Sequence, residues 1–154
     1  MNIAYIGLGS NLGNREENIQ TAVSLLSEHP HIDIQNISTL HQSKATGNTI
    51  QPDFLNGALQ LSTWLTPKEL LTETEAIEKK LGRQHKGDQS PRPIDLDILF
   101  YNDEIISTDT LTIPHPLLHE RGFVLAPLKE LCPDFIHPLF DQTIQSLYET
   151  VVGY

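Results

Sequence analysis

The sequence predicts an α+β fold in which helices pack on a largely antiparallel sheet. Some segments have strand periodicity, others repeat apolar residues at helical spacing, and the two kinds alternate in a definite order. That order is strand, helix, strand, strand, helix, strand. It is the βαββαβ order of a ferredoxin-like sandwich, whose helices cover one face of the sheet. The other face then needs a cover or a ligand.

The first strand and helix are expected within the first thirty residues. Residues 2–8 are nearly all apolar, which is typical of a buried central strand. Residues 7–13 form a glycine-rich turn, but their G-x-G-x-x-x-G spacing is one residue too long for a dinucleotide-binding fingerprint. Asn14 and Glu17 have the spacing of a capping box, and Pro30 ends the helix that they begin.

Two further strands are expected before the second helix, with a polar loop over residues 42–53 between them. Residues 31–40 predict a strand whose apolar residues change phase, which indicates either a bulge or an imperfect strand prediction. In residues 54–63 the leucines share one face, so Phe54 and Asn56 lie on the other. An aromatic ring beside an amide is either a ligand wall or, more commonly, a surface aromatic near a strand end.

The second helix is followed by an unusual basic segment. Thr66 and Glu69 have capping-box spacing and begin the helix, and Gly82 ends it. On helical spacing alone, Glu78 lies on a solvated face of this helix. Residues 82–93 have no aliphatic or aromatic side chain and more basic than acidic residues. They are either a lid over a site or a plain long loop.

The stretch SPRPIDLDILF, residues 90–100, is the most informative part of the chain. Its alternation places Asp95 and Asp97 on one face of a strand, about 6.5–7 Å apart at Cα. Two explanations stay open from the spacing alone: a solvated polar face, which is the commoner one, and a shared cation, which is supported because aspartate is a poor strand former. Divalent cations take oxygen ligands and often act in pairs in phosphoryl transfer. The same alternation predicts that Phe100 points away from the aspartates and Tyr101 with them.

Shorter elements are expected beyond residue 101. Two apolar runs predict small strands at residues 105–106 and 111–113. Residues 123–131 predict a helix that ends at Cys132, and residues 143–151 predict a closing helix.

Length and composition predict one domain over residues 1–154, large enough to bury a core. A net charge of −10 argues against nucleic acid as a partner and means that an anionic substrate needs local cations. No run approaches transmembrane length, and the N-terminus lacks a signal-peptide pattern. The single cysteine, Cys132, excludes an internal disulfide and fits a reducing cytosol. We expect a cytoplasmic protein that binds neither nucleic acid nor a membrane.

Five motifs occur in order along the chain: Gly9-Ser10-Asn11-Leu12-Gly13, Gln51-Pro52-Asp53-Phe54-Leu55-Asn56, Ile77-Glu78 with Gly82-Arg83, residues 91–99, and Pro114-His115-Pro116 with residues 121–125. Together they resemble the 6-hydroxymethyl-7,8-dihydropterin pyrophosphokinase family of folate biosynthesis, over almost the whole length. The resemblance implies transfer of the terminal diphosphate of ATP, as co-substrate, to the pterin hydroxymethyl group, with release of AMP.

The resemblance also implies a set of site residues. The implied catalytic residues are Arg83, Arg92, Asp95 and Asp97, of which Asp95 and Asp97 would hold two Mg²⁺ ions. The implied nucleotide-binding residues are His115, Arg121, Glu78 and Ile98. The implied pterin-binding residues are Ser43, Thr46, Phe54, Asn56, Phe123 and Asp95. Asn11 and Glu75 match weaker lining positions.

Two segments depart from the family's pattern, and two other functions stay open. Residues 44–46 stand where relatives often have a proline-rich turn, and residues 85–90 lack the tryptophan and second arginine that are frequent there. From the residues alone, a different metal-dependent nucleotidyl or phosphodiester enzyme could also use Asp-x-Asp. A ferredoxin-like module that senses a small molecule is the non-enzymatic alternative.

Overall fold

The computed structural model describes residues 1–44, 53–82 and 91–153. Its strands are β1 (Asn2–Ser10), β2 (Ile32–Ile37), β3 (His41–Ser43), β4 (Phe54–Thr63), β5 (Asp95–Tyr101), β6 (Ile106–Ser107) and β7 (Thr112–Ile113). Its helices are α1 (Arg15–Ser27), α2 (Pro67–Lys80), the short 3₁₀ helix η1 (Leu118–Glu120), α3 (Gly122–Leu131) and α4 (Ile144–Val151).

The main sheet has the strand order β2-β4-β1-β5, with β3 paired to β4 beyond β2. All its pairings are antiparallel. With β3 set aside, the chain order is the predicted βαββαβ, and the prediction of an α+β fold with an antiparallel sheet is confirmed. The prediction of a polar loop from residue 42 is wrong for residues 42 and 43, because they belong to β3. Residues 45–52 lie outside the described part of the chain.

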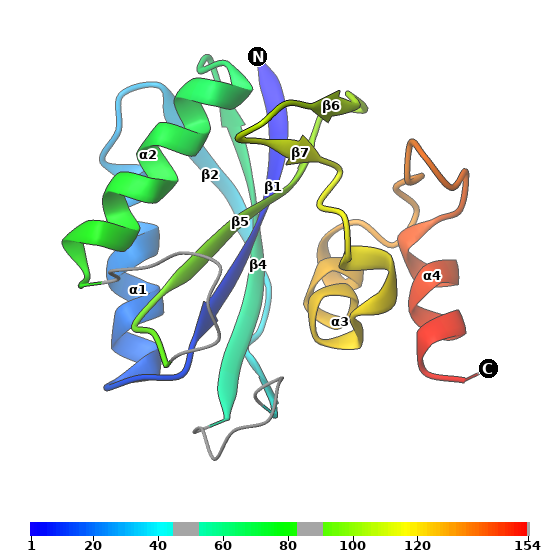
Figure 1. Cartoon of the computed structure of the whole chain (residues 1–154), viewed down its shortest axis with the longest axis horizontal. Coiled ribbons are helices and arrows are strands. Elements are labelled where there is room, and N and C mark those ends of the chain that lie inside the picture. Colours follow the sequence, from blue (N-terminus) through cyan, green and yellow to red (C-terminus); the bar gives the residue numbers. More distant parts are fainter. Residues whose placement is uncertain (45–52, 83–90, 154) are drawn as a thin grey trace.

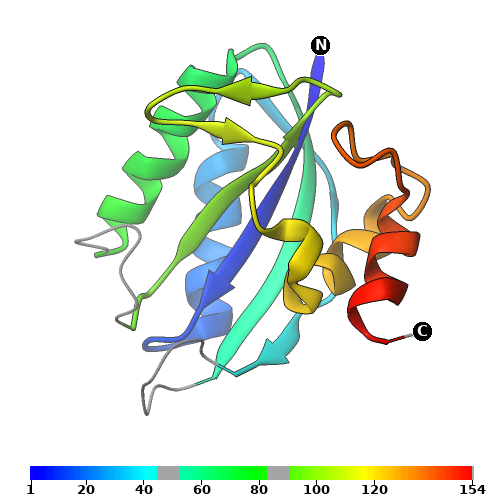
Figure 2. The ribbon, with the colours of Figure 1, turned by 45° about the vertical axis from the view of Figure 1, so that its right-hand side comes forward.

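Helices cover both faces of the sheet (Figure 1). On one face, α1 and α2 bury a core that includes Ile6, Leu26 and Leu70. On the other face, α3 and α4 bury a second core that includes Leu128 and Ile144. The β6–β7 hairpin extends from the end of β5 toward the side of α2, as Figure 2 shows. The candidate site considered below lies on this second face.

Both main helices on the first face begin as the sequence predicts. The Asn14 side chain accepts a hydrogen bond from the backbone of Glu17 at the start of α1. Thr66 and Glu69 form a complete capping box at the start of α2. These bonds satisfy backbone N–H groups that have no partner within the helix. None of the helices in the described residues is long and apolar enough to cross a membrane.

β5 contains a bulge that the alternating pattern does not predict. Its pairing with β1 skips Leu99, so Leu99 and Phe100 both pack toward α3. Tyr101 then lies in the core beneath α1 and α2. The predicted orientations of Phe100 and Tyr101 are therefore wrong, because an extra residue in one strand reverses the alternation beyond it. Asp95 and Asp97 precede the bulge and keep the predicted shared face.

The segment between α3 and α4 is held around a buried histidine. The ring of His137 lies 5.4 Å from that of Phe100 and 4.6 Å from that of Phe140, between centroids. Its Nδ1 accepts a hydrogen bond from the backbone N of Leu139 at 3.1 Å. Burial, with a smaller contribution from the charge of His119, lowers the pKa of His137 to about 4. The fold therefore contains this imidazole in its neutral form at physiological pH.

Acidification is expected to destabilise the protein through His137. Its unfolded-state pKa is near 6.5 and its folded-state pKa near 4, so between these values the unfolded chain binds more protons. The free energy of unfolding should then fall as the pH is lowered, with a slope contribution of up to about 1.4 kcal/mol per pH unit. Urea unfolding of the wild type and of His137→Asn at pH 4.5 and 7 measures this. An equal pH dependence in both proteins would contradict it.

Candidate active site

Two glycines of β1 form the floor of the candidate site. Gly9 pairs with Asn56 of β4 on one side and with Asp95 of β5 on the other, and Gly7 pairs with Asp97. Residues directly opposite one another in an antiparallel sheet point to the same face. A Cβ on Gly9 would lie 3.5 Å from Asn56 Oδ1 and 3.7 Å from Asp95 Cβ. It would also lie 3.6 Å from Phe54 Cδ1, so the missing side chain lets Phe54, Asn56 and Asp95 come close together over β1.

The two aspartates point to the face of the sheet that α3 partly covers. Asp95 and Asp97 are both partly exposed, whereas their neighbours Leu96 and Ile98 are buried. The Asp95 Oδ2 atom lies 3.7 Å from Arg92 Nε. The Asp95 carboxylate is thus accessible and close to a cation.

Arg92 is placed by the end of β1. Its backbone N donates to Asn11 Oδ1 at 2.9 Å, and the backbone N of Asn11 donates to Arg92 O at 3.1 Å. Asn11 is completely buried. These two bonds fix the backbone that precedes β5 against the glycine-rich turn, so Arg92 enters the site from a constrained position.

Glu78 of α2 lies behind β5 rather than in solvent. Its side chain is buried, and its Oε2 accepts a hydrogen bond from the backbone N of Leu96 at 2.8 Å. The expectation of a solvated face is therefore wrong. The reason is that α2 packs on β5, and a buried strand N–H needs an acceptor. Glu78 therefore fixes the backbone of Leu96, the residue between Asp95 and Asp97.

Replacement of Glu78 by alanine is expected to lower the free energy of unfolding by about 1–3 kcal/mol, because it removes the acceptor of a buried N–H group. Glu75→Ala, at an exposed position of the same helix, is the control and should be nearly neutral. Urea denaturation of both variants measures the difference. Equal stabilities of the two variants would contradict this role.

Two phenylalanines approach the site from different elements. Phe54 begins β4, and the Arg92 Cζ atom lies 5.1 Å from its ring centroid. Phe123 lies in the first turn of α3, and Arg121 Cζ lies 5.6 Å from its ring centroid. Both rings are partly exposed. An exposed aromatic face can accept a cation or a flat heteroaromatic ring.

The polar partner of Phe54 on the same face is Asn56. Its Nδ2 donates to the Oγ of Ser43 at 2.6 Å, and Asn56 is 6% exposed. Ser43 belongs to β3 and pairs with Phe54. Ser43, Phe54 and Asn56 therefore form one continuous polar and aromatic wall.

The other predicted site residues fall into three groups. His115 is partly exposed and is joined to β5, since its backbone N donates to Leu99 O at 3.1 Å. The side chain of Ile98 packs in the core, so a nucleotide could reach only its backbone. Thr46 and Arg83 lie outside the described residues, as does most of the basic segment.

Sequence reasoning missed the role of Gly7 in the floor. The signal was present, because two glycines at alternate positions of a strand allow other groups to approach one face closely. At Gly7 that group is the Leu99 side chain, which comes within 3.4 Å of where a Cβ would lie. Within the described residues, no three or more His, Cys, Asp or Glu side chains come together as a metal-binding group. Two partly exposed carboxylates suit Mg²⁺, which keeps several waters and uses substrate oxygens as further ligands.

The structure is an α+β sandwich with an antiparallel sheet that carries an aspartate pair and an aromatic wall on one face. A family model described as 7,8-dihydro-6-hydroxymethylpterin-pyrophosphokinase (HPPK) matches residues 5–133. The chain belongs to this family.

Curated relatives agree with this assignment, and a solved structure shares the fold. A Bacillus subtilis protein named 2-amino-4-hydroxy-6-hydroxymethyldihydropteridine pyrophosphokinase is 47% identical over 85% of this chain and 78% of its own length. An Aquifex aeolicus protein of the same name is 43% identical over 94% of this chain and 89% of its own length. The structure of wild-type Plasmodium falciparum HPPK-DHPS with pteroate aligns with a TM-score of 0.78 at 18% identity. It covers 98% of this chain, which spans 44% of the Plasmodium chain.

Proposed function

We propose that the chain, acting as one domain over residues 1–154, transfers the terminal diphosphate of ATP to the hydroxymethyl group of 6-hydroxymethyl-7,8-dihydropterin. The products are AMP and the pterin diphosphate, and the reaction belongs to folate biosynthesis. The observation that carries the proposal is the shared floor of β1. Gly9 lies between Asn56 of the aromatic wall and Asp95 of the aspartate pair, so an aromatic substrate and a metal-bound phosphate can meet on one face.

The nucleotide would be bound on the side of β5. Arg92 lies beside Asp95, and we assign phosphate contacts to it, to Arg121 and His115, and to Arg83. Guanidinium groups present a fork of donors that matches phosphate oxygens. Such local cations are needed because the whole chain carries a net charge of −10. We further assign Glu78 and the backbone of Ile98 to the nucleotide-binding side of the site.

Asp95 and Asp97 would hold two Mg²⁺ ions. When bound, the ions neutralise charge that develops on the transferred phosphoryl groups. The protein's own part is to keep both carboxylates on one face. It does so through the β1–β5 pairing and through the bond from Leu96 to Glu78.

The pterin would lie between Phe54 and Phe123. Ring stacking on the two phenylalanines orients the flat substrate, and Asn56 recognises its polar edge with help from Ser43 and Thr46. The substrate's own hydroxyl attacks, so the reaction needs in-line positioning rather than a protein nucleophile. We also propose a cytoplasmic monomer whose partners are only these small molecules, which fits the acidic charge and the single buried cysteine.

The direct test is an assay with ATP, Mg²⁺ and 6-hydroxymethyl-7,8-dihydropterin in which AMP is measured. We expect AMP and the pterin diphosphate in equal amounts. Release of pyrophosphate, or formation of a nucleoside monophosphate ester, would instead indicate a nucleotidyl transferase. Tight pterin binding without ATP turnover would indicate a sensing module.

A further inference from the structure

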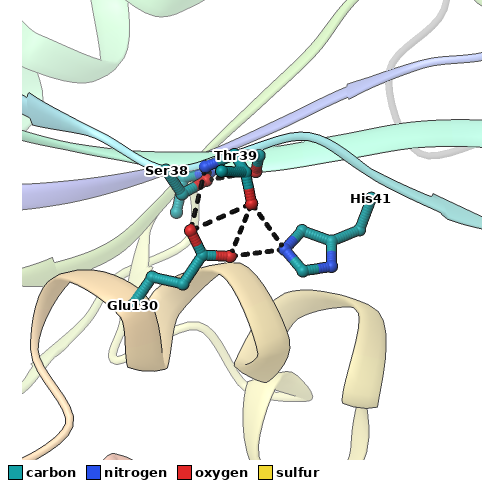
Figure 3. Close-up of polar contacts among 5 residues, drawn as sticks. Ser38, Thr39, His41 and Glu130 are labelled. Carbon is teal, nitrogen blue, oxygen red and sulfur yellow. Dashed lines mark hydrogen bonds and ion pairs between the residues drawn. The ribbon is translucent and has the colours of Figure 1, made fainter.

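A polar cluster outside the aspartate site joins α3 to the segment that leads into β3. Glu130, near the end of α3, accepts hydrogen bonds from the backbone N of Thr39 at 3.0 Å and from Thr39 Oγ1 at 2.9 and 3.0 Å (Figure 3). Its Oε2 also lies 2.5 Å from His41 Nε2. Glu130 and His41 are 89 positions apart in the chain. The cluster therefore connects two distant segments through one carboxylate.

The Glu130 carboxyl is stabilised in its charged form by this arrangement. Its side chain is 31% exposed. Burial alone would raise the pKa of Glu130, but the hydrogen bonds from Thr39 and His41 outweigh it and lower the pKa. A carboxylate that accepts several hydrogen bonds is a strong anchor for the groups that donate them.

One side of the cluster adjoins the polar and aromatic wall formed by Ser43, Phe54 and Asn56. His41 pairs with Asn56, and Ser43, two residues further along β3, pairs with Phe54. His41 and Ser43 thus point to the same face as the wall. β3 has three residues and pairs with β4, so the ladder by itself restrains it weakly. Ser38 holds the start of this segment, because its Oγ accepts from the backbone N of Ala58 at 2.9 Å.

The other side of the cluster leads along α3 to Phe123, which would form the second wall of the proposed pterin site. Phe123 and Glu130 are seven residues apart in α3, which is close to two helical turns. They therefore lie on the same side of the helix. A contact that ties Glu130 to β3 consequently limits how far the Phe123 side of α3 can move from the wall that carries Phe54.

We propose that Glu130 is a positioning residue that sets the separation between the two walls of the pterin site by tying α3 to Thr39 and His41. It acts through these residues and does not touch substrate. The inference rests on the proposed function for the identity of the ligand. The contact of Glu130 with Thr39 and His41 is a feature of the protein itself and does not depend on the proposed function.

Kinetics of Glu130→Ala test the positioning role. We expect the KM for the pterin to rise about tenfold while the KM for ATP stays within about twofold, because small displacements of positioning groups have effects of this size. Glu130→Gln keeps one acceptor for the Thr39 N–H and should show a smaller rise. Glu73→Ala is the matched control, since Glu73 forms another His–Glu pair, with His29 at 3.6 Å. It lies on α2, across the sheet.

A second variant removes the same contact from the other partner. His41→Gln should also raise the KM for the pterin selectively, and the double variant with Glu130→Ala should be little worse than Glu130→Ala alone. Equal rises in both KM values, no rise in either, or fully additive effects would overturn the proposal.

Amide hydrogen exchange of residues 39–43 tests the contact without turnover. Exchange should be faster in Glu130→Ala than in the wild type and unchanged in Glu73→Ala. Unchanged exchange in Glu130→Ala would show that Glu130 does not fix β3. If the wild type releases no AMP, the proposed function fails. The hydrogen-exchange measurement still decides whether Glu130 holds β3 against α3.

Discussion

Replacing Asp97 with alanine is expected nearly to abolish AMP release while leaving the fold intact, and Asp95→Ala should behave in the same way. Both side chains are partly exposed on the face above Gly7 and Gly9, so neither contributes to a packed core. Loss of a metal carboxylate removes charge stabilisation worth several kcal/mol, or roughly 10²- to 10⁴-fold in rate.

Initial rates with ATP, Mg²⁺ and pterin measure this effect, and thermal unfolding checks the fold. Asp109→Ala is the control, because Asp109 is an exposed acid in the connection between β6 and β7. It should leave the rate unchanged. Near-normal turnover of Asp95→Ala or Asp97→Ala would refute the assignment of this pair as metal ligands.

Phe123→Ala is expected to weaken pterin binding much more than nucleotide binding. Stacking of a flat ring on an aromatic side chain is worth about 1–3 kcal/mol, which corresponds to roughly a 5- to 150-fold rise in Kd. Arg121 packs over the same ring, so a small effect on the nucleotide side is also expected.

Titration with pterin and, separately, with a non-hydrolysable ATP analogue and Mg²⁺ measures both affinities. Phe123→Leu keeps an apolar side chain without a ring face and should lose most of the same pterin affinity. Phe140→Ala is the control, because Phe140 is 42% exposed and its ring packs at a tilt against those of His119 and His137 instead. Equal losses for pterin and nucleotide in Phe123→Ala would argue against ring stacking.

The parts of the site that depend on local periodicity could be predicted from the sequence. Asp95 and Asp97 share a face because successive residues of a strand point to opposite sides, and this needs no knowledge of the neighbouring strands. The same reasoning placed Phe54 with Asn56. The Asn14 N-cap of α1 and the Thr66–Glu69 capping box of α2 also follow from side chains within one helical turn. These predictions are local, and the structure agrees with each of them.

The parts that depend on pairing between strands could not be predicted in this way. Leu99 is skipped because β5 pairs with β1 in a particular register, and this reverses Phe100 and Tyr101. No residue within β5 marks the change. The role of Gly9 in the site follows only from the strand pairing, which places Asn56 on one side of it and Asp95 on the other.

The sequence by itself determined the α+β order of elements, the aspartate pair on one strand face and the aromatic and amide pair on another, because each follows from short-range periodicity. Only the tertiary structure decided which distant groups meet. It buried Glu78 against the N–H of Leu96, and it brought Glu130 to Thr39 and His41. The physical reason is that a polar group's environment is set by whatever element packs on it. That depends on burial and hydrogen bonding across the whole chain rather than on neighbouring residues.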